Sequence, residues 1–202
     1  MNTPCSFRPN DGDFIGPARD LLRRLQGIAL RSKSTGEPIK LLLQGDPGVG
    51  KSSLAGRFIE CIGANKWTTT KLNGTELTVE EISEWAGRLA YREIYGDYRV
   101  LWLEEVDKVN KTVQTRLLTV LDDLPDHVAV VCTSNKDLSA FEPRFQSRFQ
   151  TLVVKSPAVE EIKTLLARWP LNETDIVRIA HFCCGNVRLA LFDAQNALDG
   201  IL

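Results

Sequence analysis

Hydrophobic positions in the first third of the chain switch between two spacings. Apolar residues recur at helical intervals over residues 17–32, which predicts an amphipathic helix there. Residues Ile39–Gln44 form a short continuous apolar run bounded by turn residues, as expected for a strand buried on both faces. A glycine-rich segment follows, and helical spacing resumes over residues 51–62. The pattern predicts a strand, a glycine loop and a helix in direct succession.

The same alternation continues to about residue 155. Four further stretches rich in apolar and β-branched residues predict strands, and two stretches with helical spacing lie among them. The strands are expected at residues 67–72, 100–103, 128–132 and 151–154, and the helices at 78–91 and 109–121. Strands that alternate with helices are typical of a parallel sheet covered on both faces. The expected fold class is therefore α/β.

The pattern changes at Ser156 and Pro157, beyond which only helical spacing occurs. The helices of this part are expected at residues 159–168, 174–183 and 186–198. We predict two domains, an α/β domain of residues 1–155 and a small helical lid of residues 156–202. Residues 1–13 are rich in Pro, Asn, Asp and Gly, and are expected to form an irregular arm.

The glycine-rich segment carries the clearest chemical signal. It matches the pattern G-x-x-x-x-G-K-[ST] at every fixed position. Glycines let backbone N–H groups approach phosphate oxygens, and the N-terminus of the following helix favours an anion. The alternative is an ordinary Gly/Pro turn with a surface lysine. The predicted strand before the segment and the predicted helix after it favour a phosphate-binding loop.

Each part of this loop has an expected role toward ATP. Lys51 would reach the β- and γ-phosphates, and the Ser52 hydroxyl would bind Mg²⁺. The residues expected to bind the nucleotide here are Gly45, Asp46, Pro47, Gly48, Val49, Gly50, Lys51, Ser52 and Ser53.

Two adjacent carboxylates, Glu104 and Glu105, follow the predicted strand at residues 100–103. Ligands of open α/β sheets bind at the carboxyl ends of the strands. In a hydrolysing site, one carboxylate holds Mg²⁺ and another polarises the attacking water. We assign Glu104 to the metal, through a bridging water, and Glu105 to the attacking water, with a solvated acidic turn as the alternative. Asp107 is expected to begin the helix that follows, with a share in the site as the alternative.

Asn135 ends another predicted strand at the same edge of the sheet, where it would face the γ-phosphate or the attacking water. A turn-forming asparagine is the alternative. Three arginines are candidates to stabilise the charge of a transferring phosphoryl group. They are Arg144, Arg148 and Arg188. Taken alone, their type and position favour ordinary surface charges.

Composition narrows the class of protein. An apolar fraction of 43%, a charged fraction of 25% and a net charge of −1 fit a globular protein without an overall basic bias. Five cysteines without a CxxC pair and only two histidines make a zinc site unexpected. We recognise no secretory leader and no apolar run of bilayer length. The chain is expected to be intracellular, cytoplasmic or nuclear in a eukaryote, and neither secreted nor in a membrane.

Together these segments resemble the AAA+ ATPases, and within them the clamp-loader and replication-factor group. Residues 45–52 are similar to the Walker A motif and residues 103–107 to the end of the Walker B strand. Phe14 and Ile15, followed by a glycine and a helix, resemble the entry segment that lies near the adenine in that family. Residues 71–74, which read KLNG, resemble the LNAS stretch of clamp loaders.

The resemblance implies a five-stranded parallel sheet of order 5-1-4-3-2 that binds ATP and Mg²⁺. It implies that Asn135 is sensor 1 and that Arg188 is sensor 2 in the helical lid. Arg148 would be an arginine finger that acts on a neighbouring subunit, with Arg144 as the alternative. ATP would lie at the interfaces of a homo- or hetero-oligomeric ring. The implied function is ATP hydrolysis in DNA replication, recombination or repair, with DNA or DNA-bound replication proteins as partners.

Two features depart from that family. Glu104 stands where an aspartate is usual in the Walker B motif, which would weaken or reposition Mg²⁺ and slow hydrolysis. The predicted elements also include no counterpart of the collar domain that holds clamp-loader rings together. These departures keep a second hypothesis open, a nucleotide-gated assembly platform or a helicase or transposase loader with little hydrolysis of its own.

Overall fold

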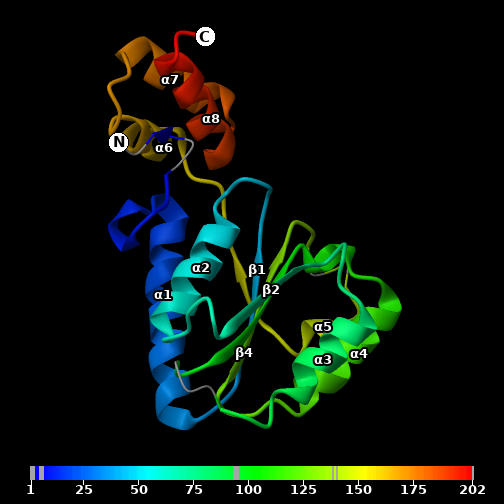
Figure 1. The fold of residues 1–202 in the computed structure, drawn as a ribbon. Coiled ribbons are helices and arrows are strands. Elements are labelled where there is room, and N and C mark those ends of the chain that lie inside the picture. The colour runs from blue at the N-terminus through cyan, green and yellow to red at the C-terminus, as the bar shows by residue number, and fades with distance from the viewer. Residues whose placement is uncertain (1–2, 5–6, 93–95, 138, 140, 202) are drawn as a thin grey trace.

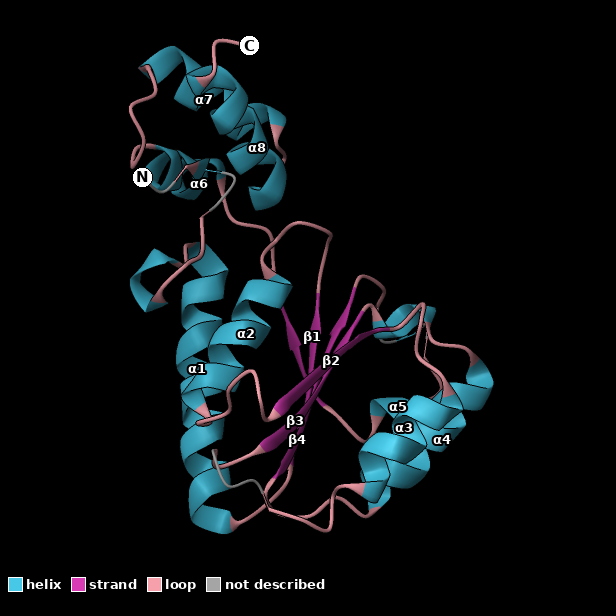
Figure 2. Ribbon diagram, viewed as in Figure 1, coloured by secondary structure: helices cyan, strands magenta, loops and turns pink. Residues whose placement is uncertain are grey.

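A computed structural model describes residues 3–4, 7–92, 96–137, 139 and 141–201. One parallel sheet lies between two layers of helices, and a separate group of three helices, α6 to α8, stands beyond its upper edge (Figure 1). Figure 2 shows the strands as one twisted layer inside the helices. No helix in these described ranges has the length and apolarity needed to cross a membrane.

The sheet has five strands in the order β2-β3-β4-β1-β5, and every neighbouring pair is parallel. Counted from the opposite edge this is 5-1-4-3-2, so the predicted α/β fold and strand order are confirmed. All seven residues of β4 are buried, because this strand lies at the centre of the sheet. The strands are β1 Ile39–Gln44, β2 Thr69–Asn73, β3 Arg99–Glu104, β4 Val128–Ser134 and β5 Gln150–Val153.

Each face of the sheet has its own hydrophobic core. In β1, Leu41 and Leu43 point into the core beneath α1 and α2, whereas Leu42 points into the core beneath α3, α4 and α5. All three side chains are completely buried, which explains the uninterrupted apolar run of this strand. The helices concerned are α1 Gly16–Thr35, α2 Lys51–Cys61, α3 Val79–Gly87, α4 Lys111–Asp122 and α5 Pro143–Gln146.

Several predicted boundaries differ from the structure by a few residues, and two of the differences have an identifiable cause. The second strand begins at Thr69 instead of residue 67, because Asn65 closes a turn by accepting the Trp67 backbone N–H at 2.8 Å. Trp67 is consequently 77% exposed and lies outside the sheet. Helix α3 ends at Gly87 instead of continuing to residue 91, and Tyr91 is 71% exposed, so the apparent helical spacing ran past the helix.

The last three helices pack around a third core. They are α6 Val159–Leu166, α7 Glu173–Phe182 and α8 Val187–Leu198. Ile15, just before α1, is buried in this core together with Ile162 and Ile179. The N-terminal arm also contacts these helices, through an edge-on contact of Phe7 with the Trp169 ring at 5.4 Å between centroids. The division into domains of residues 1–155 and 156–202 stays a prediction.

Candidate functional site

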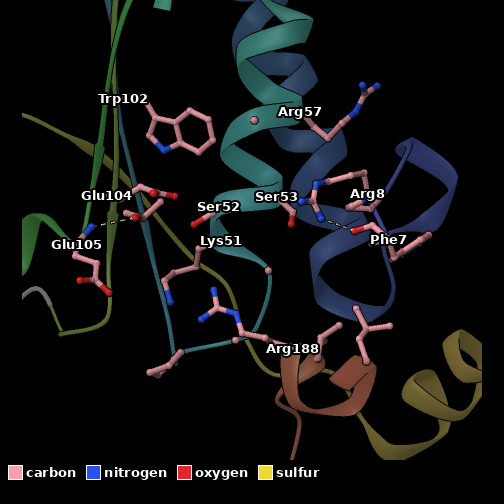
Figure 3. A pocket seen from close by; sticks show the side chains of 18 of the residues that line it. Phe7, Arg8, Lys51, Ser52, Ser53, Arg57, Trp102, Glu104, Glu105 and Arg188 are labelled. Atoms are coloured by element: carbon pink, nitrogen blue, oxygen red, sulfur yellow. Dashed lines mark hydrogen bonds between the residues drawn. The ribbon is translucent and has the colours of Figure 1, made fainter. Parts of the chain in front are cut away.

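A cleft of about 740 Å³ opens where the carboxyl ends of the central strands meet α2 and α8. Its walls come from the glycine-rich loop, the ends of β3 and β4, the first turn of α8 and the N-terminal arm (Figure 3). Ten of the residues singled out from the sequence line it: Pro47, Gly48, Gly50, Lys51, Ser52, Ser53, Glu104, Glu105, Asn135 and Arg188.

The glycine-rich loop has a backbone path that only glycine follows without strain at two points. Gly48 has φ of 82° and Gly50, immediately before α2, has φ of 97°. A Cβ atom on Gly48 would also lie 1.9 Å from Oδ1 of Asn186 in the lid. The loop therefore bends tightly enough to present the free N–H groups at the start of α2 to the cleft.

Lys51 brings a positive charge into this loop. Its Nζ donates to the backbone carbonyls of Gly45 at 2.8 Å and Asp46 at 2.7 Å, and the residue is only 7% exposed. Burial lowers the pKa of Lys51 from its usual value. An ammonium group with little water around it, next to the N-terminus of a helix, is suited to bind a polyanion.

The two carboxylates after β3 point in different directions. Glu104 still belongs to the strand and points toward the first turn of α2, where Ser52 lies (Figure 3). Glu105 has left-handed backbone angles, φ 55° and ψ 46°, so the chain turns sharply between the two residues. The Glu105 carboxylate contacts Lys108 Nζ at 2.6 Å and the side-chain amide of Asn135 at 3.4 Å. The sharp turn therefore directs the two carboxylates toward different neighbours.

Asp107 has a different position from the one expected. It does not begin the following helix, because α4 starts at Lys111 and Asn110 caps it by accepting the Val113 N–H at 3.0 Å. Asp107 instead accepts the backbone N–H of Asn135 at 3.0 Å. This bond ties the end of β4 to the turn after β3, and so holds Asn135 beside Glu105.

The lid closes one side of the cleft through α8. The backbone N–H of Arg188 donates to the carbonyl of Gly48 at 3.2 Å, and the Arg188 side chain lines the cleft (Figure 3). Asn186 caps this helix by accepting the Leu189 N–H at 3.0 Å. The lid and the glycine-rich loop are therefore in direct contact, through Gly48 on one side and the start of α8 on the other.

Seven of the sequence-predicted residues do not line the cleft: Gly45, Asp46 and Val49 of the loop, and Phe14, Ile15, Arg144 and Arg148. Phe14 and Ile15 are buried, at 5% and 7% exposure, and contribute to two different cores. Arg144 is exposed on α5. Arg148 pairs with Asp122 of α4 and lies beside the start of β1, at the opposite end of that strand from the glycine-rich loop. A six-residue strand spans roughly 20 Å, so Arg148 is directed away from its own chain's loop.

Sequence reasoning did not assign to the site several residues that line the cleft, among them Phe7, Arg8, Lys71 and Trp102. Arg8 and Phe7 belong to the arm, whose polar composition indicated only an irregular segment. Lys71 and Trp102 are register partners on β2 and β3. Trp102 could have been identified from the sequence, because alternation along β3 places it on the same face of the sheet as Glu104.

The chemistry of the residues present fits ATP with Mg²⁺. Ser52 and Glu104 offer a hydroxyl and a carboxylate oxygen to one space, and hard oxygen ligands are those that Mg²⁺ prefers. The loop offers backbone N–H groups and the Lys51 ammonium to phosphate oxygens. The fold and this cleft together define a phosphate-loop nucleotide-binding protein.

Comparison with known proteins identifies the family. Residues 41–156, more than half of the chain, match the ATPase family associated with various cellular activities (AAA). The chain belongs to this family of ATPases.

The chain is also similar in sequence to a curated relative and in fold to a solved structure. The chain is 23% identical over 216 residues to the replication factor C large subunit of Archaeoglobus fulgidus, covering 96% of this chain and 44% of the relative. The fold matches the RuvB Holliday junction branch migration motor of Thermotoga maritima with a TM-score of 0.73, at 22% identity, covering 98% of this chain and 66% of the motor.

A second solved structure also shares the fold. It is a DNA polymerase III gamma subunit-related protein of Thermotoga maritima, with a TM-score of 0.69 at 16% identity, covering 89% of this chain and 59% of that one. The chain spans from 26% to 44% of the length of the curated relatives it matches.

Replacing Gly48 by alanine is expected to destabilise the protein by about 1–2 kcal/mol, because a side chain at this φ is strained. The added methyl group would also displace Asn186 and remove the cap of α8. Thermal unfolding measures the change. Gly27→Ala is the matched control, since Gly27 lies within α1 and its added Cβ meets no atom within 4 Å. The idea fails if both variants unfold at the same temperature.

Proposed function

We propose that this protein binds ATP with Mg²⁺ in the cleft and hydrolyses it as a subunit of a ring that acts in DNA replication, recombination or repair. One observation carries the proposal. The glycine-rich loop with Lys51, two carboxylates and Asn135, and Arg188 of the lid all line a single cleft. These groups supply phosphate binding, metal ligands and a group for the attacking water in one place.

Each side chain has a role in this proposal. Lys51 and the loop N–H groups bind the β- and γ-phosphates, while Ser52 and Glu104 hold the metal. Glu105 orients and polarises the attacking water, and Asn135 fixes the position of Glu105 through its amide. Bound Mg²⁺ neutralises phosphate charge in such sites. Arg188 adds positive charge from the lid, so lid position and nucleotide binding are coupled.

The position of Arg148 supports an oligomer. Arg148 lies at the far end of β1 from its own loop, as required of a residue that completes a neighbour's site. ATP would then lie between subunits of the ring. The adenine would lie near Phe14 and Ile15, which contribute to the sheet core and the lid core, at the junction of the proposed domains, residues 1–155 and 156–202.

The proposed link to DNA rests on the relatives. Replication factor C, a Holliday junction branch migration motor and a DNA polymerase III gamma-related protein share sequence or fold with this chain. A clamp-loader-like role, with DNA or DNA-bound replication proteins as partners, is consistent with all three names.

A second candidate is a nucleotide-gated assembly platform, or a helicase or transposase loader, with little hydrolysis of its own. The observation that favours it concerns Glu104. Its side chain is longer than that of the aspartate usual in the Walker B motif, and its carboxylate is paired with Lys71 Nζ at 2.9 Å. Steady-state ATPase measurements over a range of protein concentrations, with and without DNA, separate the two candidates. Turnover per subunit that rises with concentration and with DNA supports the motor. Tight ATP binding without turnover supports the platform.

Replacing Arg148 by alanine is expected to lower turnover about 1,000-fold or more, because an arginine finger stabilises charge that develops in the transition state. ATP affinity should change little. Asp122→Ala is the matched control, since it breaks the same ion pair and leaves the guanidinium in place. Mixing Arg148→Ala subunits with Lys51→Met subunits tests action between chains. If Arg144→Ala lowers turnover and Arg148→Ala does not, the arginine finger is Arg144 instead of Arg148.

A further inference from the structure

Lys71 is a charged residue of the cleft to which the proposed function assigns no role. Its Nζ lies 2.9 Å from Oε2 of Glu104 and 4.1 Å from the centre of the Trp102 ring. The Glu104 side chain is 22% exposed and that of Lys71 49%, so the contact forms at the wall of the cleft. The ammonium thus occupies the carboxylate that the proposed function assigns to Mg²⁺.

The register of the sheet explains this contact. Lys71 is the register partner of Trp102, and Asn73 is the partner of Glu104. Lys71 and Glu104 are therefore diagonal neighbours on one face, a separation that two long side chains can span. The Lys71 ammonium lies over the Trp102 ring, whose outer edge lies near Gly56 of α2. A shorter residue at position 104 would reach the ammonium less well.

Mg²⁺ and the Lys71 ammonium compete for the single negative charge of the Glu104 carboxylate, whose Oε2 contacts Lys71. Binding of the metal at Glu104 therefore weakens an existing ion pair, and its apparent affinity is reduced by the free energy lost from that pair. The neighbouring carboxylate has its own cation, because Glu105 pairs with Lys108 at 2.6 Å. Each of the two carboxylates after β3 is thus paired with one lysine.

We propose that Lys71 is a positioning residue that holds the metal-binding carboxylate of Glu104 until Mg²⁺ displaces it. The inference rests on the proposed function, and it adds a residue that sets the Mg²⁺ requirement of the site. Displacement leaves the ammonium over the face of Trp102 without its carboxylate partner, and the ring still attracts the cation. The charge beside the tryptophan therefore changes when the metal binds.

The test is a MgCl₂ titration of the full chain at a fixed concentration of a non-hydrolysable ATP analogue. In Lys71→Met the Mg²⁺ concentration at half-saturation is expected to fall about threefold to fivefold, the range set by a partly exposed ion pair. Affinity for the analogue in EDTA should stay the same, because that measurement involves the loop and not Glu104. Lys71→Arg keeps a cation and should retain the wild-type midpoint.

Lys108→Met is the matched control. It removes a lysine of similar exposure, 48% against 49%, from the neighbouring carboxylate. Its Mg²⁺ midpoint should remain that of the wild type. A spectroscopic readout comes from Trp102, whose emission should respond to Mg²⁺ in the wild type. That response should be lost in Trp102→Phe and strongly reduced in Lys71→Met.

The outcomes are distinct. An unchanged midpoint in Lys71→Met, with nucleotide binding intact, overturns the inference and leaves the proposed function standing. A fall in affinity in EDTA without a shift in the midpoint would mean that Lys71 binds phosphate instead, and also overturns it. If the wild-type chain binds no nucleotide with or without Mg²⁺, the proposed function itself is wrong.

Discussion

Replacing Lys51 by methionine is expected to weaken ATP binding about 100-fold, because a bond from a charged donor contributes about 1.5–3 kcal/mol. The ammonium already lies inside the loop, bonded to the carbonyls of Gly45 and Asp46. A phosphate group that replaces these carbonyls gains a full charge–charge contact in a site with little water. Methionine has a similar length and keeps the packing, but it offers neither donor nor charge. Calorimetry with a non-hydrolysable ATP analogue measures the loss.

The same substitution should leave the ligand-free fold almost as stable as before. Burial lowers the pKa of Lys51, which means that the ammonium is less favourable in the folded chain than in the unfolded chain. Loss of that charge offsets the loss of two hydrogen bonds, and thermal unfolding should show similar midpoints. Lys66→Met is a suitable control, because Lys66 lies 4.8 Å from the centre of the Trp67 ring, outside the cleft. Wild-type affinity in Lys51→Met would disprove a phosphate site at this loop.

Most of the fold could be predicted because its signals are local. The continuous apolar run of β1 is long enough for a strand and too short for most helices, and its side chains fill cores on both faces. Boundaries were less accurate where side-chain hydrogen bonds decide them. The Asn65 side chain accepts the backbone N–H of Trp67, so a turn forms where the strand was expected to begin. Hydrophobic spacing along the sequence does not reveal such a local hydrogen bond.

The residues of the candidate site also fall into two groups, those recognised from a local pattern and those brought to the cleft only by the fold. Residues of the glycine-rich loop follow one another in sequence, so their pattern could be recognised without the fold. Lys71 and Arg8 reach the cleft only through the register of β2 with β3 and through the contacts of the arm with the lid. Such placements depend on tertiary packing, which no window of a single sequence contains. Asp107 shows the same limit, since its partner Asn135 is 28 residues away.

The two carboxylates after β3 should be separable by experiment. The turn at Glu105, with its left-handed backbone, directs one side chain toward α2 and the other toward the end of β4. Glu104→Gln should therefore mainly raise the Mg²⁺ requirement. Glu105→Gln should mainly affect the chemical step, because the residue contacts Asn135 and Lys108 and no phosphate-binding group.

In Glu105→Gln, turnover is expected to fall about 100-fold to 1,000-fold while ATP stays bound, since a positioned general base typically contributes a factor of this size. Glutamine keeps the shape and the contact with Asn135 but cannot accept a proton. Steady-state ATPase rates measure turnover, and the fraction of ATP retained after rapid gel filtration measures how much ATP stays bound. A variant that traps ATP should also keep any nucleotide-dependent oligomer assembled for longer than the wild type.

The control for this variant is Glu84→Gln, which removes a carboxylate that pairs with Arg88 on the outer surface of α3. Its turnover should equal that of the wild type. Full turnover in Glu105→Gln would show that another group activates the water, and Glu104 would be the first to test. Loss of ATP binding together with turnover would instead show that Glu105 supports the loop or the metal, because a residue that acts only on water does not contribute to the affinity of the ground state.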